Sequence, residues 1–322
     1  MELTGDEVLS WSEWLTLDMG EPAWLIPGIL ERGGGGMVHG ASRAFKSFFL
    51  LRLCLDLAAG LPVMDIWPLP RPYRTLLLQA EGSKQSWRRR MLALREHYPE
   101  EMPFWSRHSL TMLLDSKEGI EAMDNALSIT EPDLVVVDPL ANFFSGSEMD
   151  EESIKRWIRV MNQWREKFGC AVVICAHDRQ TIRFQGKGGL TELNAGMEEA
   201  RGRTNLPAWS DFVAGFKRKG DSTTMSIQKV REQADGQEFH FSLQGGRLIL
   251  TGRSDAIEAV IFTHVNSGKE WWLAQLSEAV AKDANVSART ARRAIEKMVE
   301  DGQLNRIPDG MRFKIVRGDD SQ

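Results

Sequence analysis

The 322-residue chain has few cysteines, no excess of positive charge and no long apolar run. Its three cysteines, Cys54, Cys170 and Cys175, lie in apolar stretches without metal-ligand spacing, which predicts buried thiols in a reducing cytoplasm. A formal net charge of -5 and a pI near 5.8 argue against coating of nucleic acid by bulk charge, so any such binding must be local. Because the chain has no 18-residue apolar run and no basic N-terminal region, we expect neither a membrane span nor a secretory signal.

The remaining composition is that of an ordinary globular protein. Apolar residues make up 42% of the chain and charged residues 26%, and the length leaves room for two domains. Apolar strands alternate with amphipathic helices up to residues 252–254, and short helices with a hairpin follow. The alternation predicts an α/β domain with a mostly parallel sheet, followed by a smaller domain.

Residues 39–48 match a phosphate-binding loop with one irregular letter. The pattern is Gly, four residues, Gly, Lys, and Ser or Thr; Gly40, Lys46 and Ser47 fit it, and Phe45 replaces the second glycine. A short strand before the loop and an apolar helix after it would direct backbone N–H groups at a phosphate. We expect Lys46 to reach the outer phosphates and the Ser47 hydroxyl to bind Mg²⁺. A chance match in a glycine-rich region is the alternative. The predicted loop residues are Gly40, Ala41, Ser42, Arg43, Ala44, Phe45, Lys46, Ser47 and Phe48.

Polar residues end three apolar strands. Glu81 follows residues 74–80, Asp138 ends residues 134–138, and His177 follows residues 170–176. Because α/β sheets bind ligands at their C-terminal edge, we expect the three side chains to lie together. Asp138 would then bind Mg²⁺ with Ser47, Glu81 would act as the base for water, and His177 would sense the outer phosphate. The alternatives are a strand-end Asp, a solvated Glu and a histidine with a structural hydrogen bond.

Further elements are predicted from periodicity and capping residues. The predicted helices are 6–18, 84–97, 116–129 and 151–168; the predicted strands are 36–39, 74–81, 110–114, 134–138 and 170–176, with hairpins 211–220/223–232 and 238–243/247–251. The glycine-rich segment 179–207 is predicted to be a functional loop.

The C-terminal residues have the pattern of a winged helix-turn-helix module. Helices are predicted at 255–265, 273–282 and 287–301, and a hairpin at 304–316. The third helix carries Arg289, Arg292, Arg293 and Lys297, which we expect to bind DNA. Such modules bind duplex DNA or serve as docking sites for a replication protein, and both alternatives remain open.

Residues 24–251 resemble the RecA-like ATPases of the plasmid RepA and replicative hexameric helicase type. The matching features are the loop with Gly40, Lys46 and Ser47, then Glu81, 134–138, 172–177, and the run Ala200-Arg201-Gly202-Arg203-Thr204. The resemblance covers about two-thirds of the chain and leaves the C-terminal module outside. Phe45 departs from the family glycine, and we interpret it as a variant that keeps the site active.

The resemblance implies further roles. Glu81 would be the catalytic base, Arg90 would contact the phosphates, and Arg201 would be an arginine finger reaching a neighbouring subunit's nucleotide. Lys229 and Arg231 would form a second basic pair of similar purpose. Arg88 and Arg89 are rivals of Arg90, and ordinary surface arginines are the competing interpretation. Loops 143–151 and 182–196 would line a channel for single-stranded DNA, with Arg183 and Lys187 contacting its phosphates, although the first loop is acidic.

The sequence therefore predicts a cytoplasmic, ATP- and Mg²⁺-dependent DNA motor that forms a ring, with six subunits as the expected number. The predicted division is an N-terminal helical segment (1–22), a RecA-like ATPase domain (23–252), a winged helix domain (253–318) and a tail (319–322). An ATP-regulated DNA-binding or loading protein and a non-hydrolysing scaffold are the alternatives.

Overall fold

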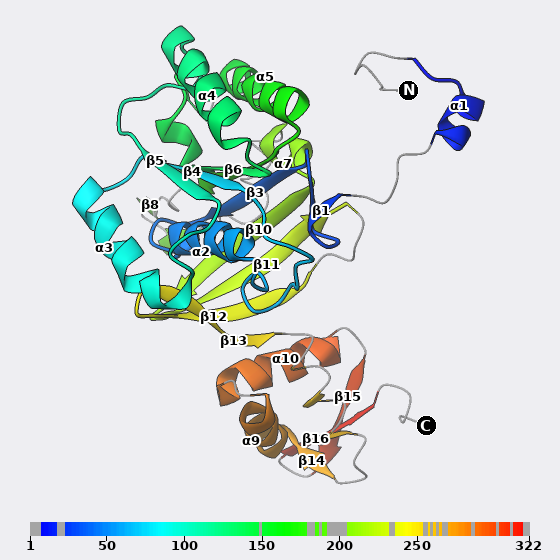
Figure 1. Cartoon of the computed structure of the whole chain (residues 1–322). Helices are drawn as coiled ribbons and strands as arrows, with labels where there is room; N and C mark the ends of the chain where they lie inside the picture. The colour runs from blue at the N-terminus through cyan, green and yellow to red at the C-terminus, as the bar shows by residue number, and fades with distance from the viewer. Residues whose placement is uncertain are drawn as a thin grey trace.

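A computed structural model describes two bodies, a larger one around a nine-stranded sheet and a smaller C-terminal one (Figure 1). The described residues are 8–17, 23–147, 150–178, 184–186, 189–191, 205–231, 236–253, 270–284, 287–300, 303–309 and 312–317, with Ile257, Val260, Ile261, His264 and Val265.

The large sheet has the strand order β13-β12-β11-β10-β3-β7-β6-β4-β5. The strands from β10 to β5 are parallel, and β11, β12 and β13 extend the sheet by antiparallel pairing. This confirms the predicted α/β class with a mostly parallel sheet. The strand bounds are β3 Gly35–Gly40, β4 Thr75–Gln79, β5 Phe104–His108, β6 Leu134–Asp138, β7 Ala171–His177, β10 Phe212–Lys219, β11 Ser222–Val230, β12 Glu238–Gln244 and β13 Arg247–Arg253.

Helices cover both faces of the sheet (Figure 1). Val136 of β6 packs into the core that contains α2, whereas its neighbours Val135 and Val137 pack into the core that contains α4 and α5. Successive strand residues point to opposite faces, so a strand of consecutive valines suits a sheet buried on both sides. The helix bounds are α2 Lys46–Ala59, α3 Lys84–Leu94, η1 Arg95–His97, α4 Lys117–Thr130, η2 Leu140–Asn142, α5 Glu151–Phe168 and α7 Asn205–Trp209.

Helix boundaries follow the capping residues in the sequence. Ser83, Ser116 and Asp150 each accept a hydrogen bond from the backbone N–H three residues later, which confirms the predicted starts of three helices. Gly169 ends α5 in the left-handed conformation, with φ 62°. All three cysteines are buried and free, as predicted.

One predicted strand is wrong. Residues 110–114 form a bent, irregular segment, and the strand in this region is β5, at Phe104–His108. β5 is the edge strand of the sheet and its central residues are exposed, so it has no apolar run for a sequence pattern to detect. Within 110–114, Leu114 is buried while Leu110 and Leu113 are exposed. Leu114 packs in the core and the partly buried Met112 packs against it, so these apolar residues anchor an irregular segment.

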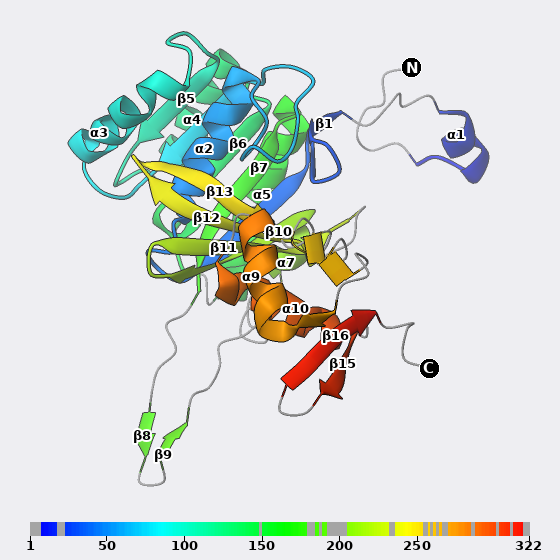
Figure 2. The ribbon, with the colours of Figure 1, turned by 90° about the horizontal axis from the view of Figure 1, so that it is seen from below.

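The described N-terminal residues form a short helix, α1 (Trp11–Thr16), which stands apart from the body in Figures 1 and 2. Ser10 and Glu13 form a capping box, which shortens the predicted helix 6–18 to six residues. The chain then forms a small antiparallel pair, β1 (Trp24–Ile26) and β2 (Leu30–Glu31), before it enters β3. Among the described residues, no helix combines the length and apolarity needed to cross a membrane.

The C-terminal module, residues 257–317, has its own core of buried apolar side chains. It contains α9 (Leu273–Asp283), α10 (Ala288–Glu300) and a three-stranded sheet, β14 (Trp271–Trp272), β16 (Arg312–Arg317) and β15 (Leu304–Asp309). The predicted second and third helices and the hairpin are therefore present. Most of the predicted helix 255–265 lies outside the described residues. β14 was missed because two residues give no periodicity.

Candidate nucleotide site

The phosphate loop connects β3, the central strand of the sheet, to α2. Gly40 pairs with His177 on one side and with Phe216 on the other. Gly40 has φ 151°, and a Cβ added there would lie 2.5 Å from the Phe216 carbonyl oxygen. Glycine is therefore required where the loop leaves the strand.

Phe45, the irregular residue, has the backbone conformation that glycine adopts freely. Its φ is 68° and it immediately precedes α2. The ring packs edge-on against Phe48, with centroids 5.9 Å apart, and the Arg218 guanidinium carbon lies 4.2 Å from the Phe45 ring centroid. Arg218 also donates a hydrogen bond to the Arg43 carbonyl at 3.2 Å. Phe45 thus holds a left-handed backbone position just before α2, at the cost of a strained backbone.

Lys46 lies inside the loop, and the residue is only 4% exposed. It donates to the carbonyl oxygens of Gly40 at 2.7 Å and Ala41 at 2.9 Å, and lies 3.2 Å from Nδ1 of His177. An ammonium group only donates, so Nδ1 must accept and the ring proton is assigned to Nε2. That nitrogen lies 3.5 Å from the Glu81 carboxylate. Lys46, His177 and Glu81 therefore form one connected row.

The two acids at the site have opposite pKa shifts. The hydrogen bond from His177 lowers the pKa of Glu81, helped by the charges of Lys46 and Arg90, so Glu81 is ionised. Burial raises the pKa of Asp138, although this carboxylate accepts hydrogen bonds from the Ser47 hydroxyl and the Cys175 thiol. A buried carboxylate with a raised pKa favours a cation as its partner.

Arg90 of α3 lies near Glu81 and is partly buried, whereas its rivals Arg88 and Arg89 are exposed. Its guanidinium carbon lies 4.2 Å from the Phe48 ring centroid, and burial lowers its pKa. Its Nη1 is buried and has no hydrogen-bond partner among the described residues. A buried unsatisfied guanidinium group needs an acceptor, and a phosphate oxygen supplies one.

A cavity of about 210 Å³ lies at this sheet edge, and Ser47, Glu81 and Arg90 line it. Its further lining residues are Gln79, Gly82, Ser86 and Trp87. Sequence reasoning missed Gln79, which is 3% exposed and accepts a hydrogen bond from the Glu81 N–H at 2.6 Å. The signal was one polar letter in an otherwise apolar strand.

These residues fit a nucleotide with Mg²⁺. Lys46, Arg90 and the α2 N-terminus would bind its phosphates. Ser47 and Asp138 would hold the ion, and no group of three metal-ligating His, Cys, Asp or Glu side chains exists in the described parts of the chain. Mg²⁺ commonly takes one or two carboxylates together with phosphates and water. When bound, the ion neutralises charge on the phosphates.

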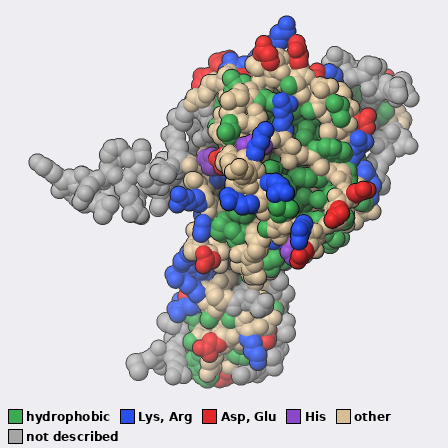
Figure 3. Space-filling model, turned by 60° about the vertical axis from the view of Figure 1, so that its left-hand side comes forward, with side chains coloured by type: hydrophobic (Ala, Val, Ile, Leu, Met, Phe, Trp, Pro, Cys, Tyr) green, Lys and Arg blue, Asp and Glu red, His purple; other side chains and the backbone are tan. Residues whose placement is uncertain are grey.

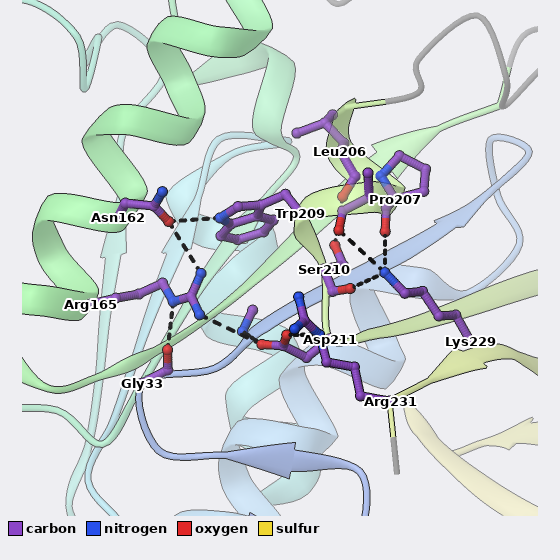
Figure 4. A network of polar contacts seen from close by, with 12 residues as sticks. Gly33, Asn162, Arg165, Leu206, Pro207, Trp209, Ser210, Asp211, Lys229 and Arg231 are labelled. Atoms are coloured by element: carbon purple, nitrogen blue, oxygen red, sulfur yellow. Dashed lines mark hydrogen bonds and ion pairs between the residues drawn. The ribbon is translucent and has the colours of Figure 1, made fainter. Parts of the chain in front are cut away.

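Lys229 and Arg231 lie at the opposite end of the sheet from the phosphate loop. Val230 pairs with Phe212, which pairs with Gly36, four residues before the loop begins. At about 3.3 Å per residue this is roughly 13 Å, so these cations do not contact their own chain's nucleotide. Lys229 donates to the carbonyls of Pro207, Ala208 and Ser210 at 2.9, 3.3 and 2.6 Å (Figure 4).

Arg231 is also held locally, at 2.6 Å from the Asp211 carboxylate. Asp211 accepts a hydrogen bond from the Gly35 N–H at 2.6 Å and pairs with Arg165 at 3.6 Å (Figure 4). This network fixes the start of β3. Arg201, Arg183 and Lys187 lie outside the described residues, so their predicted roles stay predictions.

The described part of loop 143–151 is anchored to the body. Ser145 donates to Asp115 through its N–H at 2.9 Å and its hydroxyl at 2.6 Å, and the Trp157 indole donates to the Ser145 carbonyl at 2.9 Å. Asp115 also pairs with Arg156 at 3.2 Å. These contacts, and the acidic residues that follow, weaken the prediction that this loop tracks DNA.

A family model described as an AAA domain matches residues 7–181, more than half of the chain. The chain belongs to this AAA domain family. The match contains the phosphate loop, Glu81, Asp138 and His177, so the candidate nucleotide site lies within the AAA domain. No curated protein matches the sequence. Among solved structures, a KaiC-like protein from Pyrococcus horikoshii OT3 is similar, with 12% identity, a TM-score of 0.45, and coverage of 70% of this chain and 93% of that chain.

Proposed function

We propose that this AAA domain protein is an ATP-driven DNA motor of the plasmid or phage replication type, which hydrolyses ATP at the interfaces of a ring, with six subunits expected. The observation that carries the ATPase part is the row Lys46–His177–Glu81 beside the buried Asp138. Glu81 is ionised and lines the cavity, where it can accept a proton from the attacking water. Lys46 and Arg90 would stabilise the negative charge that develops on the phosphates.

Two features support a ring of identical subunits. α1 has no buried residue, and Trp11, Trp14 and Leu15 are 76%, 54% and 66% exposed. Exposed aromatic side chains on a detached helix fit a binding surface on a neighbouring subunit. Lys229 and Arg231 lie far from their own loop, so a contact with nucleotide requires another subunit's loop.

The proposed partners are single-stranded DNA in the ring channel and duplex DNA or a replication protein at the C-terminal module. The module's elements are compatible with a winged helix, and its α10 carries four cations. These cations equally favour a second candidate function, an ATP-regulated DNA-binding or loading protein that does not unwind DNA.

An ATPase assay with and without single-stranded DNA tests the proposal. Stimulation by single strands supports the motor, and binding of duplex without stimulation supports the regulator. Glu81→Gln should keep nucleotide binding and lower kcat by about 10²- to 10⁴-fold. Glu96→Gln, an exposed carboxylate on η1, is the matched control and should keep wild-type turnover. Normal hydrolysis by Glu81→Gln would refute the assignment of the base.

Mixing subunits tests the shared interface. Arg201→Ala subunits combined with Glu81→Gln subunits should recover part of the activity, because some interfaces then hold both intact groups. No recovery at any ratio would argue against an arginine supplied by a neighbour.

A further inference from the structure

A large cleft separates the ATPase sheet from the C-terminal module. In Figures 1 and 2, α10 lies beside the β11–β13 side of the sheet. The cleft has a volume of about 980 Å³. We call it the interdomain cleft, and its lining residues are Lys217, Arg218, Lys219, Ser222, Thr224, Glu238, His240, Thr251, Ile257, Ser287, Arg289, Thr290, Arg293, Ala294 and Lys297.

The interdomain cleft is strongly basic in a chain whose net charge is -5. Six of its side chains are cationic, three from each side, and Glu238 is its one carboxylate. Burial lowers the pKa of His240, which keeps that ring neutral. Lysine and arginine side chains gather where the smaller body meets the larger one (Figure 3).

Five of these six cations make no ion pair with a described residue: Lys217, Lys219, Arg289, Arg293 and Lys297. The sixth, Arg218, lies 4.0 Å from Asp221. The charges of the two sides also act on each other. The pKa of Lys219 is lowered, first by Arg289 and then by burial and Arg293. Like charges held this close repel, and an anion between them removes the repulsion.

The shape of the cleft favours the binding of an extended polyanion over the binding of a small anion. Its cations extend over two turns of α10, at residues 289, 293 and 297, and along residues 217–219 opposite. Hydroxyl residues also line the cleft, but most are bound within the protein: Thr251 donates to the His240 carbonyl at 3.0 Å, Thr224 lies 3.0 Å from the His240 ring, and Ser287 and Thr290 share a hydrogen bond at 2.8 Å. The Ser222 hydroxyl makes no hydrogen bond with a described residue and can donate to a phosphate oxygen without sequence preference. The extended row of cations fits a repeating phosphodiester chain.

The same geometry disfavours duplex DNA as the ligand of the cleft itself. A recognition helix must enter a major groove about 12 Å wide with its reading face free. The face of α10 that carries Arg289 and Arg293 is instead one wall of the cleft, opposite the ATPase strands. Arg292 lies outside the lining, and pairs with Glu296 at 3.0 Å, where Arg306 also approaches at 3.5 Å. The structure thus divides the four α10 cations that sequence reasoning had grouped.

We propose that the interdomain cleft binds the backbone of single-stranded nucleic acid, with Lys217, Lys219, Arg289, Arg293 and Lys297 contacting phosphates. The inference rests on the proposed action on DNA, and it adds a binding site outside the ring channel. Binding in the cleft needs no nucleotide at Lys46, because none of the five cations belongs to the phosphate loop.

The test compares neighbouring arginines of one helix. Anisotropy of a labelled oligo(dT) of about 15 nucleotides is measured against salt for the full chain, for Lys219→Ala/Arg293→Ala, and for Arg292→Ala. Each lost phosphate contact lowers the salt slope by about 0.7, which is about fivefold in affinity at 0.1 M relative to 1 M salt. We expect a slope lower by about 1.4 and binding weaker by about 25-fold for the double variant, and unchanged binding for Arg292→Ala. All three side chains are exposed, so unchanged thermal melting verifies folding.

Three results would overturn the inference. The double variant could keep the wild-type slope, or Arg292→Ala could weaken binding as much. Duplex of equal length could compete better than the single strand, which would indicate duplex docking. Inorganic triphosphate could displace the oligonucleotide when one triphosphate binds per chain, and the affinity for oligo(dT) could be independent of its length. Together these results would indicate a site for small anions.

A failure of the proposed motor function can be distinguished from a failure of the proposed cleft site. The binding series is run without nucleotide and repeated with Lys46→Ala, where the cleft should still bind oligo(dT). Cleft-dependent binding without stimulation of ATP hydrolysis would reject the motor and keep the cleft. Stimulated hydrolysis with wild-type binding by the double variant would reject the cleft and keep the motor.

Discussion

Replacing Phe45 separates the cost of its backbone conformation from the value of its ring. Both Phe45→Ala and Phe45→Gly remove the contacts with Phe48 and Arg218. Only alanine keeps the strain of a side chain at φ 68°, which costs about 1–2 kcal/mol, while glycine loses roughly 0.5–1 kcal/mol through the flexibility of the unfolded chain. We therefore expect Phe45→Gly to be more stable than Phe45→Ala by about 0.5–1 kcal/mol.

Thermal unfolding followed by circular dichroism measures this difference, which corresponds to about 1–4 °C in a domain of this size. Phe48 provides the control, because it lies in α2 three residues later. In a helix alanine is favoured over glycine by about 1 kcal/mol, so Phe48→Ala should be more stable than Phe48→Gly. The same order of stability at both positions would refute the strain at Phe45. Because the Phe45 ring does not line the cavity beside Glu81, Phe45→Gly should also bind ATP with near-wild-type affinity.

Three further predictions concern the nucleotide site and assembly. Arg90→Ala should weaken ATP binding about tenfold to a hundredfold by calorimetry, because a charged hydrogen bond is lost, whereas exposed Arg89→Ala should leave it unchanged; equal effects would remove Arg90 from the site. Because the pKa of Asp138 is raised in the folded protein, the folded state binds the carboxyl proton more tightly than the unfolded chain, and the ionised carboxylate destabilises the fold once the pH rises above the unfolded pKa. At neutral pH, Asp138→Asn should therefore raise the melting temperature measured without Mg²⁺ and abolish the stabilisation by Mg²⁺ with ATP. A lower melting temperature without Mg²⁺ would contradict this sign. Trp14→Ser should shift the chain to smaller assemblies in light scattering, and an unchanged mass would exclude α1 as the subunit contact.

The nucleotide site could be predicted because its ingredients are local in sequence. An apolar strand followed by a polar residue is visible in the letters before Glu81, Asp138 and His177, and parallel strands bring such ends to one edge. The finer contacts were not visible. That His177 lies between Lys46 and Glu81, and that the Cys175 thiol donates to Asp138, depends on side-chain directions set by packing.

Edge strands and strained turns escape the same reasoning. β5 is half polar because one edge and much of its surface face water, so the adjacent apolar letters at 110–114 attracted the strand prediction instead. Phe45 could not be resolved either, because the sequence does not say whether its backbone is left-handed. In the structure Phe45 has φ 68°, so its side chain occupies a strained left-handed position whose cost can be measured.

The interdomain cleft shows where sequence periodicity stops. At 100° per residue, positions 289, 293 and 297 fall within an arc of about 80° on α10, but position 292 lies only about 60° from position 289, so the letters alone do not separate Arg292 from the other three cations. What the letters cannot supply is which face meets the ATPase domain, because residues 217–219 are about seventy positions away in the chain.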